Sequence, residues 1–376
     1  MKKGWQTKTL GDVCHVYQPE TISQKQMIAG EFRVYGANGQ IGWHNQFNHE
    51  DPELILGCRG SCGTVHVTEP RSWINGNAMV VHPTNGAMDI SFLAYALKGG
   101  IELTDAITGA AQPQITRTSL MPLVISFPES LAEQQRIVGL LDEAFEGLAT
   151  AKANAGKNLQ NARALFESHL QSVFTQRGPG WVDSTIGAEI KFIDYRGKTP
   201  VKTTSGVRLI TAKNVKMGFL QETPMEFIAA ASYKGWMTRG IPQKGDVLFT
   251  TEAPLANVAQ LDTDEKVAFA QRIIIMQPNA ARLDSTFLKY LLLSQPVQQR
   301  IRTKGTGATV QGIKASLLKL IEILFPQSLT TQEEIVSKLD DLREETQRLA
   351  RLYERKLAAL EALKKSLLHQ AFTGEL

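Results

Sequence analysis

The sequence predicts an α+β fold: two α/β domains separated by two long helices that form an antiparallel coiled coil, with a pseudo-two-fold internal repeat. Three observations predict it. One block of sequence occurs twice, each copy carries a heptad pattern, and the blocks between the copies contain short strand-like runs and turns. The predicted boundaries are 1–128 and 178–326 for the two variable blocks, and 129–177 and 327–376 for the two helices.

The repeated block recurs at a spacing of 198 residues without a gap. Residues 108–175 and 306–373 share 23 identities in 68 positions, where average composition would give roughly one in fifteen by chance. A fainter echo, shifted by 176 residues, joins Gly4-Trp5 to Gly180-Trp181 near the start of each variable block. The similarity indicates an internal duplication.

The repeated blocks are predicted to be long helices, each starting after a proline with Ser130 or Ser328 as the N-cap. About 45 helical residues would make a rod of about 65–70 Å, too long for the ordinary core helices of one globule, which is the alternative. The heptad positions that would face the partner helix form a seam along each helix. One seam is rich in Ala where the other has larger residues, so the two helices would pack closely. The seams are Ile137, Leu141, Ala144, Leu148, Ala151, Ala155, Asn158, Ala162, Leu165 and His169, and Ile335, Leu339, Leu342, Thr346, Leu349, Tyr353, Lys356, Leu360, Leu363 and Leu367.

The variable blocks are predicted to be α+β. Short apolar runs bounded by Gly, Pro and Asn are typical of strands, and two longer apolar segments are typical of helices. Six glycines make residues 33–64 rich in turns. The predicted strands include 53–56, 77–81 and 246–249, and the predicted helices are 89–98 and 284–303.

The composition is that of a soluble globular protein of two or three domains, with 376 residues, 43% hydrophobic and 21% charged. No apolar stretch is long enough to span a bilayer, and the polar start is not that of a signal peptide. Cys14, Cys58 and Cys62 are an odd and sparse set, which argues against a disulfide framework and indicates a reducing cytoplasm.

The net charge of +4 is too small to prove a polyanionic partner, but its distribution is uneven. Residues 1–128 carry 9 basic and 10 acidic side chains, a net of −1, and each helical segment is also at −1. Residues 178–326 carry 19 basic and 12 acidic side chains, a net of +7. The excess positive charge therefore lies in the second variable block.

Known catalytic motifs are missing from the sequence: it has no G-x-x-x-x-G-K-[ST] phosphate loop, no H-E-x-x-H, no G-x-S-x-G and no amino-methyltransferase tetrapeptide. Cys58, Cys62 and His66 are spaced by four, which suggests zinc. Glycines between them and the lack of a fourth ligand favour structural thiols instead. Asp246 and Glu252 could hold a metal as in a nuclease, but no nearby Lys completes that site. We therefore predict no catalytic residues and no metal site.

Polar side chains of the kinds that contact nucleic acids gather in or beside Gly-rich loops of both variable blocks. Arg, Asn and Gln have the geometry to read base edges, whereas Lys and Thr mostly hold phosphates. A solvated loop surface would explain any single one, so the cluster carries the hypothesis. The candidates are Arg33, Asn38, Gln40, His44, Arg59, Arg71, Asn75 and Asn77 in the first block, and Arg196, Lys198, Thr199, Lys202, Arg208, Lys213, Asn214, Lys216 and Arg272 in the second.

Several motifs carry a resemblance to a known family. The first repeated block contains TGAAQPQI at 108–115 and AEQQRIV at 132–138, and the variable blocks contain VYGANGQIG at 34–42, DYRGKTP at 194–200 and ITAKNV at 210–215. Together with the variable–helix–variable–helix order, which spans the whole chain, they resemble the specificity (S) subunit of Type I restriction–modification systems. The second copy departs from the pattern at 310–312, which leaves the contacts of its turn open.

The resemblance implies a non-catalytic, cytoplasmic protein with no membrane association. In that family each target-recognition domain reads one half of a bipartite double-stranded DNA target. The paired helices set the unread spacer and dock two methyltransferase (M) subunits. Those subunits bind S-adenosylmethionine and methylate adenine; restriction (R) subunits are optional partners, and ATP and Mg²⁺ are also bound by partners, so no cofactor is expected in this chain. The alternative left open is a non-enzymatic coiled-coil adaptor with two ligand-binding heads.

Overall fold

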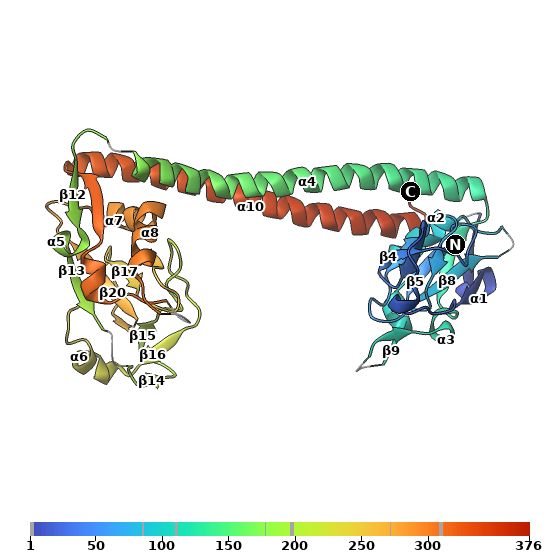
Figure 1. Ribbon diagram of the computed structural model, residues 1–376, viewed down its shortest axis with the longest axis horizontal. Helices are drawn as coiled ribbons and strands as arrows, with labels where there is room; N and C mark the ends of the chain where they lie inside the picture. Colours follow the sequence, from blue (N-terminus) through green and yellow to red (C-terminus); the bar gives the residue numbers. More distant parts are fainter. Residues whose placement is uncertain are drawn as a thin grey trace. The chain divides into compact units, whose positions relative to one another are not determined.

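The computed structural model describes residues 4–84, 86–109, 112–176, 178–195, 199–270, 272–307 and 311–376. The chain divides into two compact units, the first formed by Met1–Lys157 and Tyr353–Leu376 and the second by Asn158–Leu352. Two helices of 45 residues, α4 (Leu131–Thr175) and α10 (Leu329–Thr373), each contribute residues to both units. Figure 1 labels these elements along the chain.

The first unit holds a four-stranded sheet in the order β2-β8-β5-β6 and a three-stranded sheet in the order β4-β3-β7, together with two strand pairs, β1-β11 and β9-β10. Only β3 and β7 run parallel among these pairs. Its elements before α4 are β1 Trp5–Thr9, α1 Leu10–Val13, β2 Cys14–Tyr17, η1 Gln24–Gln26, β3 Phe32–Gly36, β4 Gly39–His44, β5 Leu54–Gly57, β6 Val65–Val67, β7 Trp73–Ile74, β8 Ala78–Pro83, α2 Ile90–Tyr95, η2 Ala96–Gly100, η3 Leu103–Ala106, β9 Ile107–Thr108, β10 Gln114–Ile115, α3 Arg117–Leu120 and β11 Val124–Pro128.

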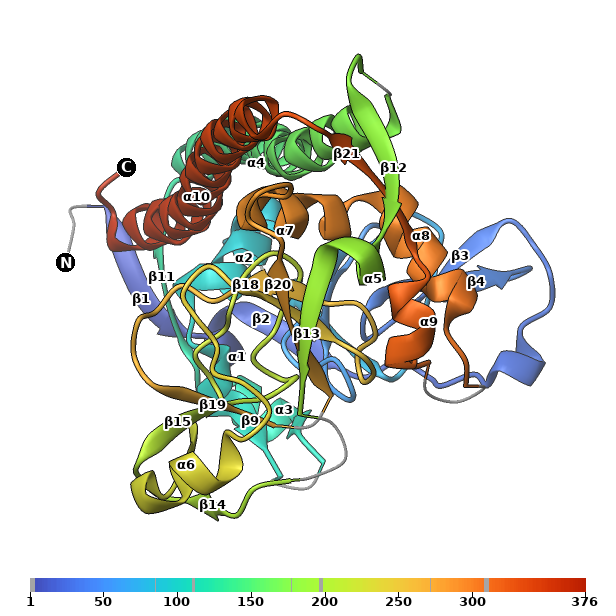
Figure 2. The ribbon, with the colours of Figure 1, turned by 90° about the vertical axis from the view of Figure 1, so that its left-hand side faces the viewer.

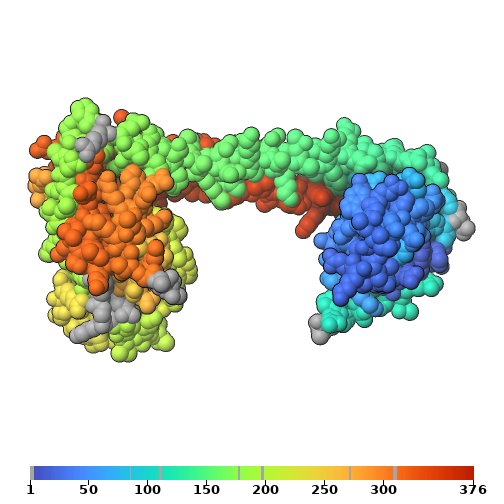
Figure 3. Space-filling view, viewed as in Figure 1, coloured from blue at the N-terminus to red at the C-terminus, as the bar shows by residue number. Residues whose placement is uncertain are grey.

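The second unit repeats this plan, with a four-stranded sheet β13-β20-β17-β18, a second sheet β14-β16-β15-β19 and the strand pair β12-β21. Figure 2 turns this unit toward the viewer, and Figure 3 shows residues from α7 to β21, in orange, over much of its visible face. Its elements are β12 Trp181–Thr185, α5 Ile186–Glu189, β13 Ile190–Asp194, β14 Lys202–Thr203, β15 Val207–Ile210, β16 Glu226–Ile228, η4 Ala230–Ser232, α6 Tyr233–Trp236, β17 Val247–Thr250, β18 Val258–Gln260, β19 Val267–Phe269, β20 Ile273–Pro278, α7 Ser285–Leu293, α8 Gln295–Lys304, α9 Ala315–Lys319 and β21 Glu322–Pro326.

The predicted elements are present, and one of them is divided. The segment 284–303, predicted as a single helix, forms α7 and α8 with a break at Ser294. Ser294 is extended, and Pro296 lies in the first turn of α8. Proline lacks a backbone N–H and fits the first turn of a helix but not its interior, so it starts a new helix here.

The sheets β2-β8-β5-β6 and β13-β20-β17-β18 each pack an apolar face against a short helix and the long helices. In the first unit Leu56 of β5 and Phe92 of α2 lie in one buried cluster with Ile137 of α4 and Ala371 of α10. The second unit buries Phe249 of β17, Phe287 of α7, Leu170 of α4 and Leu339 of α10 in the same way. The predicted fold class is confirmed: two related α/β domains, each packed on parts of both long helices.

Two matched contacts attach the start of each long helix to its domain. β1 pairs with β11 from Trp5↔Pro128 to Thr9↔Val124, and β12 pairs with β21 from Trp181↔Pro326 to Thr185↔Glu322. These pairs explain why the Gly-Trp dipeptides echo each other at the start of both variable blocks. The strand that opens each domain lies beside the strand that leads into its helix.

A fully buried glutamine completes each attachment. Gln134 of α4 accepts a hydrogen bond from Asp89 N at 2.7 Å and donates to the carbonyls of Ala87 and Pro128. Gln332 of α10 makes the same bonds in the second unit, accepting from Asp284 N at 2.8 Å and donating to the carbonyls of Arg282 and Pro326. The conserved spacing of these two residues in the repeat therefore has a structural cause.

The helices pair antiparallel, but the predicted seam is partly wrong. In the first unit Lys152 pairs with Glu361, and Lys364 lies over the ring of Phe145 at 5.3 Å, so residue numbers run in opposite directions. Leu165 and Leu363, both assigned to the seams, are 51% and 48% exposed. An α-helix drifts about 20° per heptad relative to a strict seven-residue repeat. Ile137, Leu141, Ala155 and Ala162 of the predicted seam are buried, but beyond Ala162 the buried residues of α4 are Leu170 and Phe174 in place of Leu165 and His169.

Candidate functional site

Four of the candidate residues line one shallow hollow in the second unit. The hollow has a volume of about 230 Å³, and Lys202, Lys213 and Arg272 reach it from β14, from the turn after β15 and from the residue before β20. Thr199 is the fourth, and the other lining residues are Thr211, Ala212, Glu226, Ala253 and Ala270. The tertiary structure thus brings together side chains that are up to 73 positions apart, counting from 199 to 272.

Two carboxylates balance part of this positive charge. Lys202 Nζ lies 2.8 Å from Glu226 Oε1, and Arg272 Nε lies 2.9 Å from Glu252 Oε1. The side chains of Arg272 and Glu252 are 45% and 46% exposed, so this ion pair is accessible from outside. A carboxylate partner orients a basic side chain at the cost of part of its attraction for phosphate. Two of the three basic side chains at the hollow are therefore paired with carboxylates, and it is not simply a positive patch.

In the first unit, exposed candidates lie around the ends of the central strands. Asn38 is in the turn between β3 and β4, and Gln40 is on β4. Arg59 lies two residues after the end of β5, and Asn77 lies directly before β8. Cys58 N donates to Asn77 O at 3.2 Å, which holds these last two segments side by side. The set therefore lies at strand ends of both sheets of this unit.

Two arginines of the first unit contact aromatic rings. Arg33 on β3 lies 5.8 Å from the centroid of Trp43 and pairs with Glu69 at 3.4 Å. Arg71 lies 5.9 Å from the centroid of Phe32 and has a positive φ of 50°. Rings of this kind hold a guanidinium in place, so both arginines are positioned residues at the surface.

Three of the candidate DNA-contacting residues have a structural role and do not belong to the site. Asn214 is 1% exposed, and its amide bonds to Thr211 N and to the carbonyls of Gln221 and Pro224. Asn75 is 3% exposed and donates to Ile22 O. His44 is 5% exposed, with its Nδ1 beside Ile28 N at 3.0 Å. Asn is common in turns because its side chain hydrogen-bonds to the backbone, and sequence alone does not separate that role from base contact.

The remaining candidates of the second block differ in how well they are placed. Arg196 and Lys198 lie outside the described residues. Arg208 on β15 and Lys216 after it are half-buried. Lys216 N donates to Phe219 O at 3.0 Å, which closes a turn. Both remain candidates for phosphate contact.

Two of the three thiols, those of Cys58 and Cys62, form hydrogen bonds within the protein. Cys58 is buried, with Sγ donating to Asn77 O at 3.1 Å and accepting from Gln18 Nε2 at 3.1 Å, and burial raises its pKa. Cys62 Sγ donates to Pro113 O at 3.0 Å. Throughout the part of the chain that the structure describes, no three His, Cys, Asp or Glu side chains are grouped as metal ligands would be.

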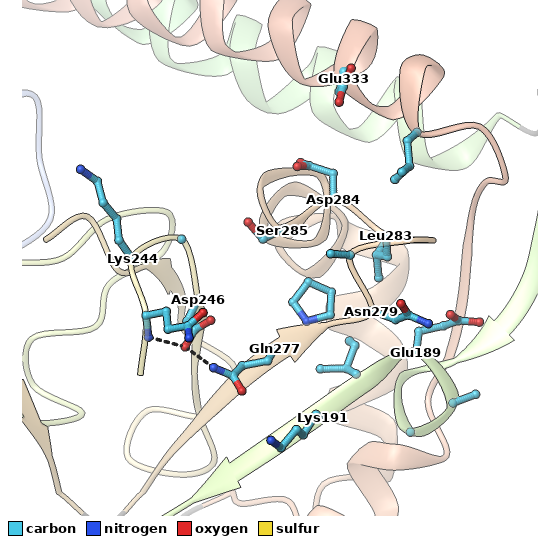
Figure 4. A pocket seen from close by; sticks show the side chains of 18 residues that line it. Glu189, Lys191, Lys244, Asp246, Gln277, Asn279, Leu283, Asp284, Ser285 and Glu333 are labelled. Carbon is cyan, nitrogen blue, oxygen red and sulfur yellow. Dashed lines mark hydrogen bonds between the residues drawn. The ribbon is translucent and has the colours of Figure 1, made fainter. Parts of the chain in front are cut away.

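A second, larger hollow of about 870 Å³ lies elsewhere in the second unit, and Figure 4 shows its lining. Asp246 lies in it, accepting from Gln243 N and Gln277 Nε2, both at 2.8 Å. Burial raises the pKa of this carboxyl. Glu252, the other half of the metal pair considered from sequence, is paired instead with Arg272. The two carboxylates thus have different partners.

The turn of the second copy keeps its backbone contacts although its sequence departs from the pattern. Thr306 and Gly312 exchange two backbone hydrogen bonds of 2.8 and 2.9 Å, and Thr108 faces Gln114 at the same place in the first copy. Gly312 also forms a bridge with Glu252, as Gln114 does with Arg59. The two copies therefore share the backbone pairing at the ends of this turn, and residues 110, 111 and 308–310 lie outside the described residues.

Sequence reasoning missed Glu252 and Glu226 as members of the site. Acidic residues do not match the expected pattern for a DNA surface, so a search for Arg, Lys, Asn and Gln passes over them. Glu226 is 24 positions from Lys202 and Glu252 is 20 positions from Arg272, so no local signal in the sequence marks either residue. Only the sheet topology, which pairs segments distant in sequence, identifies the partners.

This architecture defines a class of protein that recognises ligands with two related but divergent domains built on repeated helices. The family model for the Type I restriction modification DNA specificity domain matches residues 2–155 and again 206–355. The chain belongs to this family and is a DNA-recognition subunit. The adaptor alternative has no support from these matches.

Solved structures agree with the fold. One, from work on complex assembly and conformational transition of the type I R-M system, has a TM-score of 0.79 at 17% identity, covering 100% of this chain and 99% of that one. The HsdS subunit from Thermoanaerobacter tengcongensis has a TM-score of 0.64 at 18% identity, with 100% and 98% covered. Among curated proteins, none matches this sequence. No helix within the described ranges is long and apolar enough to cross a membrane.

Proposed function

We propose that residues 1–128 and 178–326 are two target-recognition domains, each reading one half of a bipartite double-stranded DNA target. The proposal rests on one observation: the two domains share an arrangement of strands but carry different polar side chains at the strand ends. The sheets β2-β8-β5-β6 and β13-β20-β17-β18 share strand order and register, while the exposed residues at strand ends differ, as Asn38 and Asn77 differ from Lys213 and Arg272. Domains that bound the same DNA sequence would need the same side chains at these positions.

The long helices set the spacer and dock two methyltransferase subunits in this proposal. They carry large apolar side chains that the chain itself leaves exposed, including Leu140, Leu165, Leu352 and Leu363 at 42–51% exposure. Leu165 and Leu363 are equivalent residues of the repeat, 198 positions apart. A duplicated apolar position on duplicated helices supports two copies of one partner, bound in equivalent ways.

The chemistry would reside in the partners. We propose that this chain binds no cofactor, that methyltransferase subunits supply S-adenosylmethionine-dependent adenine methylation, and that restriction subunits add ATP- and Mg²⁺-dependent cleavage where they join. This chain would position the DNA target relative to those subunits. Its three cysteines are free thiols, which suits a cytoplasmic location.

The test is an exchange of residues 178–326 for the corresponding block of a relative with a different target. We expect the methylated sequence to change in one half-site only, because the first domain and both helices remain. Methylation-site sequencing of cells that carry the chimera and its methyltransferase partners measures both halves together. A change in both half-sites would contradict independent reading, and turnover by the purified chain alone would contradict a non-catalytic role.

A further inference from the structure

The two domains hold their strand ends with the same backbone hydrogen bonds. Cys58 N donates to Asn77 O at 3.2 Å, and Thr251 N donates to Arg272 O at 2.9 Å. Ile115 N donates to Cys58 O at 3.0 Å, and Ile313 N donates to Thr251 O at 2.9 Å. Cys58 and Thr251 are therefore equivalent positions, each between the same two neighbouring segments.

The turns that follow these positions have positive φ at the same two places. In the first domain Gly60 and Gly63 have positive φ values of 76° and 82°. In the second, Ala253 and Ala256, each 193 positions further on, have positive φ values of 48° and 66°. Positive φ is easy for Gly but costs about 1–2 kcal/mol for Ala. The second domain thus keeps positive φ at both places at an energetic cost, which indicates that the backbone direction at these places matters.

On this shared frame the two domains place different side chains. The residue after the equivalent Cys58 and Thr251 is Arg59 in the first domain and Glu252 in the second. The residue before the next central strand is Asn77 in the first and Arg272 in the second. Arg59, Asn77 and Arg272 are exposed, and Glu252 is half-exposed. We call these two places the paired positions. They are occupied by Arg59 and Asn77 in the first domain and by Glu252 and Arg272 in the second.

The paired positions of the second domain are set for oriented contact. Arg272 has a positive φ of 78°, its Nε is 2.9 Å from Glu252 Oε1, and it lines the hollow with Lys213 and Lys202. A carboxylate on Nε restrains the guanidinium plane. The Nη edge of Arg is the group that binds guanine O6 and N7 with two hydrogen bonds, whereas Asn matches adenine.

We infer that the paired positions determine the base preference of each domain, with Arg272 reading guanine in the second half-site and Glu252 as its positioning residue. The inference rests on the proposed function, since it names the residues through which one domain reads its half. In the first domain Arg59 and Asn77 occupy the same places, so that domain prefers different bases although its backbone frame is the same.

The experiment uses the full chain in complex with its methyltransferase partners and a DNA library randomised over both half-sites. Arg272→Asn preserves tolerance of a positive φ and introduces the residue found at position 77. Glu252→Gln removes the charge that orients Arg272. Lys244→Gln is the matched control, because Lys244 lies in the same domain, pairs with Asp264 and is not at the paired positions.

We expect Arg272→Asn to reduce discrimination at one base position of the second half-site by roughly 5- to 150-fold, the equivalent of one bidentate base contact. Glu252→Gln should give a smaller loss at that same position, and Lys244→Gln none. The first half-site should be unchanged in all three. Thermal unfolding of each variant checks that the fold is intact, because a merely structural role would lower stability without changing a single base preference.

Two results would overturn the inference. A uniform loss of binding across all sequences, with a shallower salt dependence, would make Arg272 a phosphate contact. Unchanged preferences in a complex that still selects a bipartite target would place the determinants elsewhere. Both differ from failure of the proposed function, in which the unaltered complex itself would select no bipartite sequence.

Discussion

Ala253 illustrates at the residue scale how the second domain differs energetically from the first. It has a positive φ of 48° where the first domain has Gly60. We expect Ala253→Gly to stabilise the second unit by about 0.5–1 kcal/mol, because relief of the strain exceeds the extra freedom of Gly in the unfolded chain. Urea unfolding measures the difference. The exposed Ala281, which does not have a positive φ, is the control, and Ala281→Gly should destabilise instead.

Asp246 gives a prediction on pH dependence. Burial raises the pKa of this carboxyl above its ordinary value of 3.8. The folded chain therefore keeps the proton over a pH interval in which the unfolded chain has lost it, so the wild type loses stability as pH rises through that interval. Asp246→Asn keeps an oxygen for Gln243 N and Gln277 Nε2 and has no proton to lose.

We accordingly expect Asp246→Asn to gain stability relative to the wild type as pH rises from about 4 toward 7, with no further change once Asp246 is fully ionised. Urea unfolding across this pH range measures the difference between the two proteins. Asp262→Asn, at an exposed site of the same domain, should show no comparable trend. A constant difference between Asp246→Asn and the wild type at all pH values would contradict the role given to burial.

At the element scale the buried glutamines attach the long helices to the sheets. Gln134→Leu would leave Asp89 N and the carbonyls of Ala87 and Pro128 without this partner in a buried place. Unpaired buried groups cost about 1–3 kcal/mol each before relaxation, so we expect a loss of about 3 kcal/mol. The neighbouring Gln135 is exposed, and Gln135→Leu should change stability little.

Hydrogen exchange tells whether this loss is local. Amides of α2 and of the first turns of α4 should exchange faster in Gln134→Leu, while the second unit keeps its protection, because Gln332 serves that unit separately. Equal acceleration in both units would show that the two attachments are not independent. The same substitution at Gln332 should reverse the pattern.

A further pair of contacts at the element scale is repeated in both units. Tyr95 donates to Asp142 of α4, and Tyr290 donates to Asp340 of α10. Burial, together with the acidic partner, raises the pKa of Tyr95 to about 12 and raises that of Tyr290 as well. Both phenols therefore remain protonated donors at neutral pH, and each links its domain to its helix.

At the scale of the whole molecule, both long helices run through both units, which changes how the spacer proposal is tested. The unit boundary falls at 157/158 in α4 and at 352/353 in α10. An insertion in α4 alone would leave α10 at its original length, so the insertion must be made in both helices. Inserting seven residues after Lys157 and seven after Leu352 keeps the same face of each helix toward its partner. It lengthens each helix by about 10.5 Å.

We expect the double insertion to lengthen the unread spacer by roughly three base pairs, at about 3.4 Å each, and to leave both half-sites unchanged. Methylation-site sequencing measures spacer and half-sites together. The matched control is the α4 insertion alone, which should impair activity without defining a new spacer. An unchanged spacer with full activity in the double variant would show that the helices do not set the distance.

Sequence by itself determined the duplication, the two long helices and the α/β character of the variable blocks. These depend on periodicity and on repeated identities, which are local or one-dimensional features and need no knowledge of packing. Sequence also predicted the surroundings of the site, since Arg59, Asn77, Lys213 and Arg272 are all exposed near strand ends. Strand ends and Gly-rich turns are visible in a sequence because special backbone conformations require particular residues.

Only the tertiary structure decided which polar residues belong to the site and how they pair. Asn214 and Asn75 resemble Asn77 in sequence, yet both side chains are buried and their amide nitrogens donate to backbone carbonyls. A buried side chain that holds the backbone in this way is not available to a ligand. The equivalence of Glu252 with Arg59 is likewise invisible in an alignment whose variable blocks have diverged. It follows from which segments the sheets place side by side, and hydrogen bonding between strands, not sequence similarity, determines that arrangement.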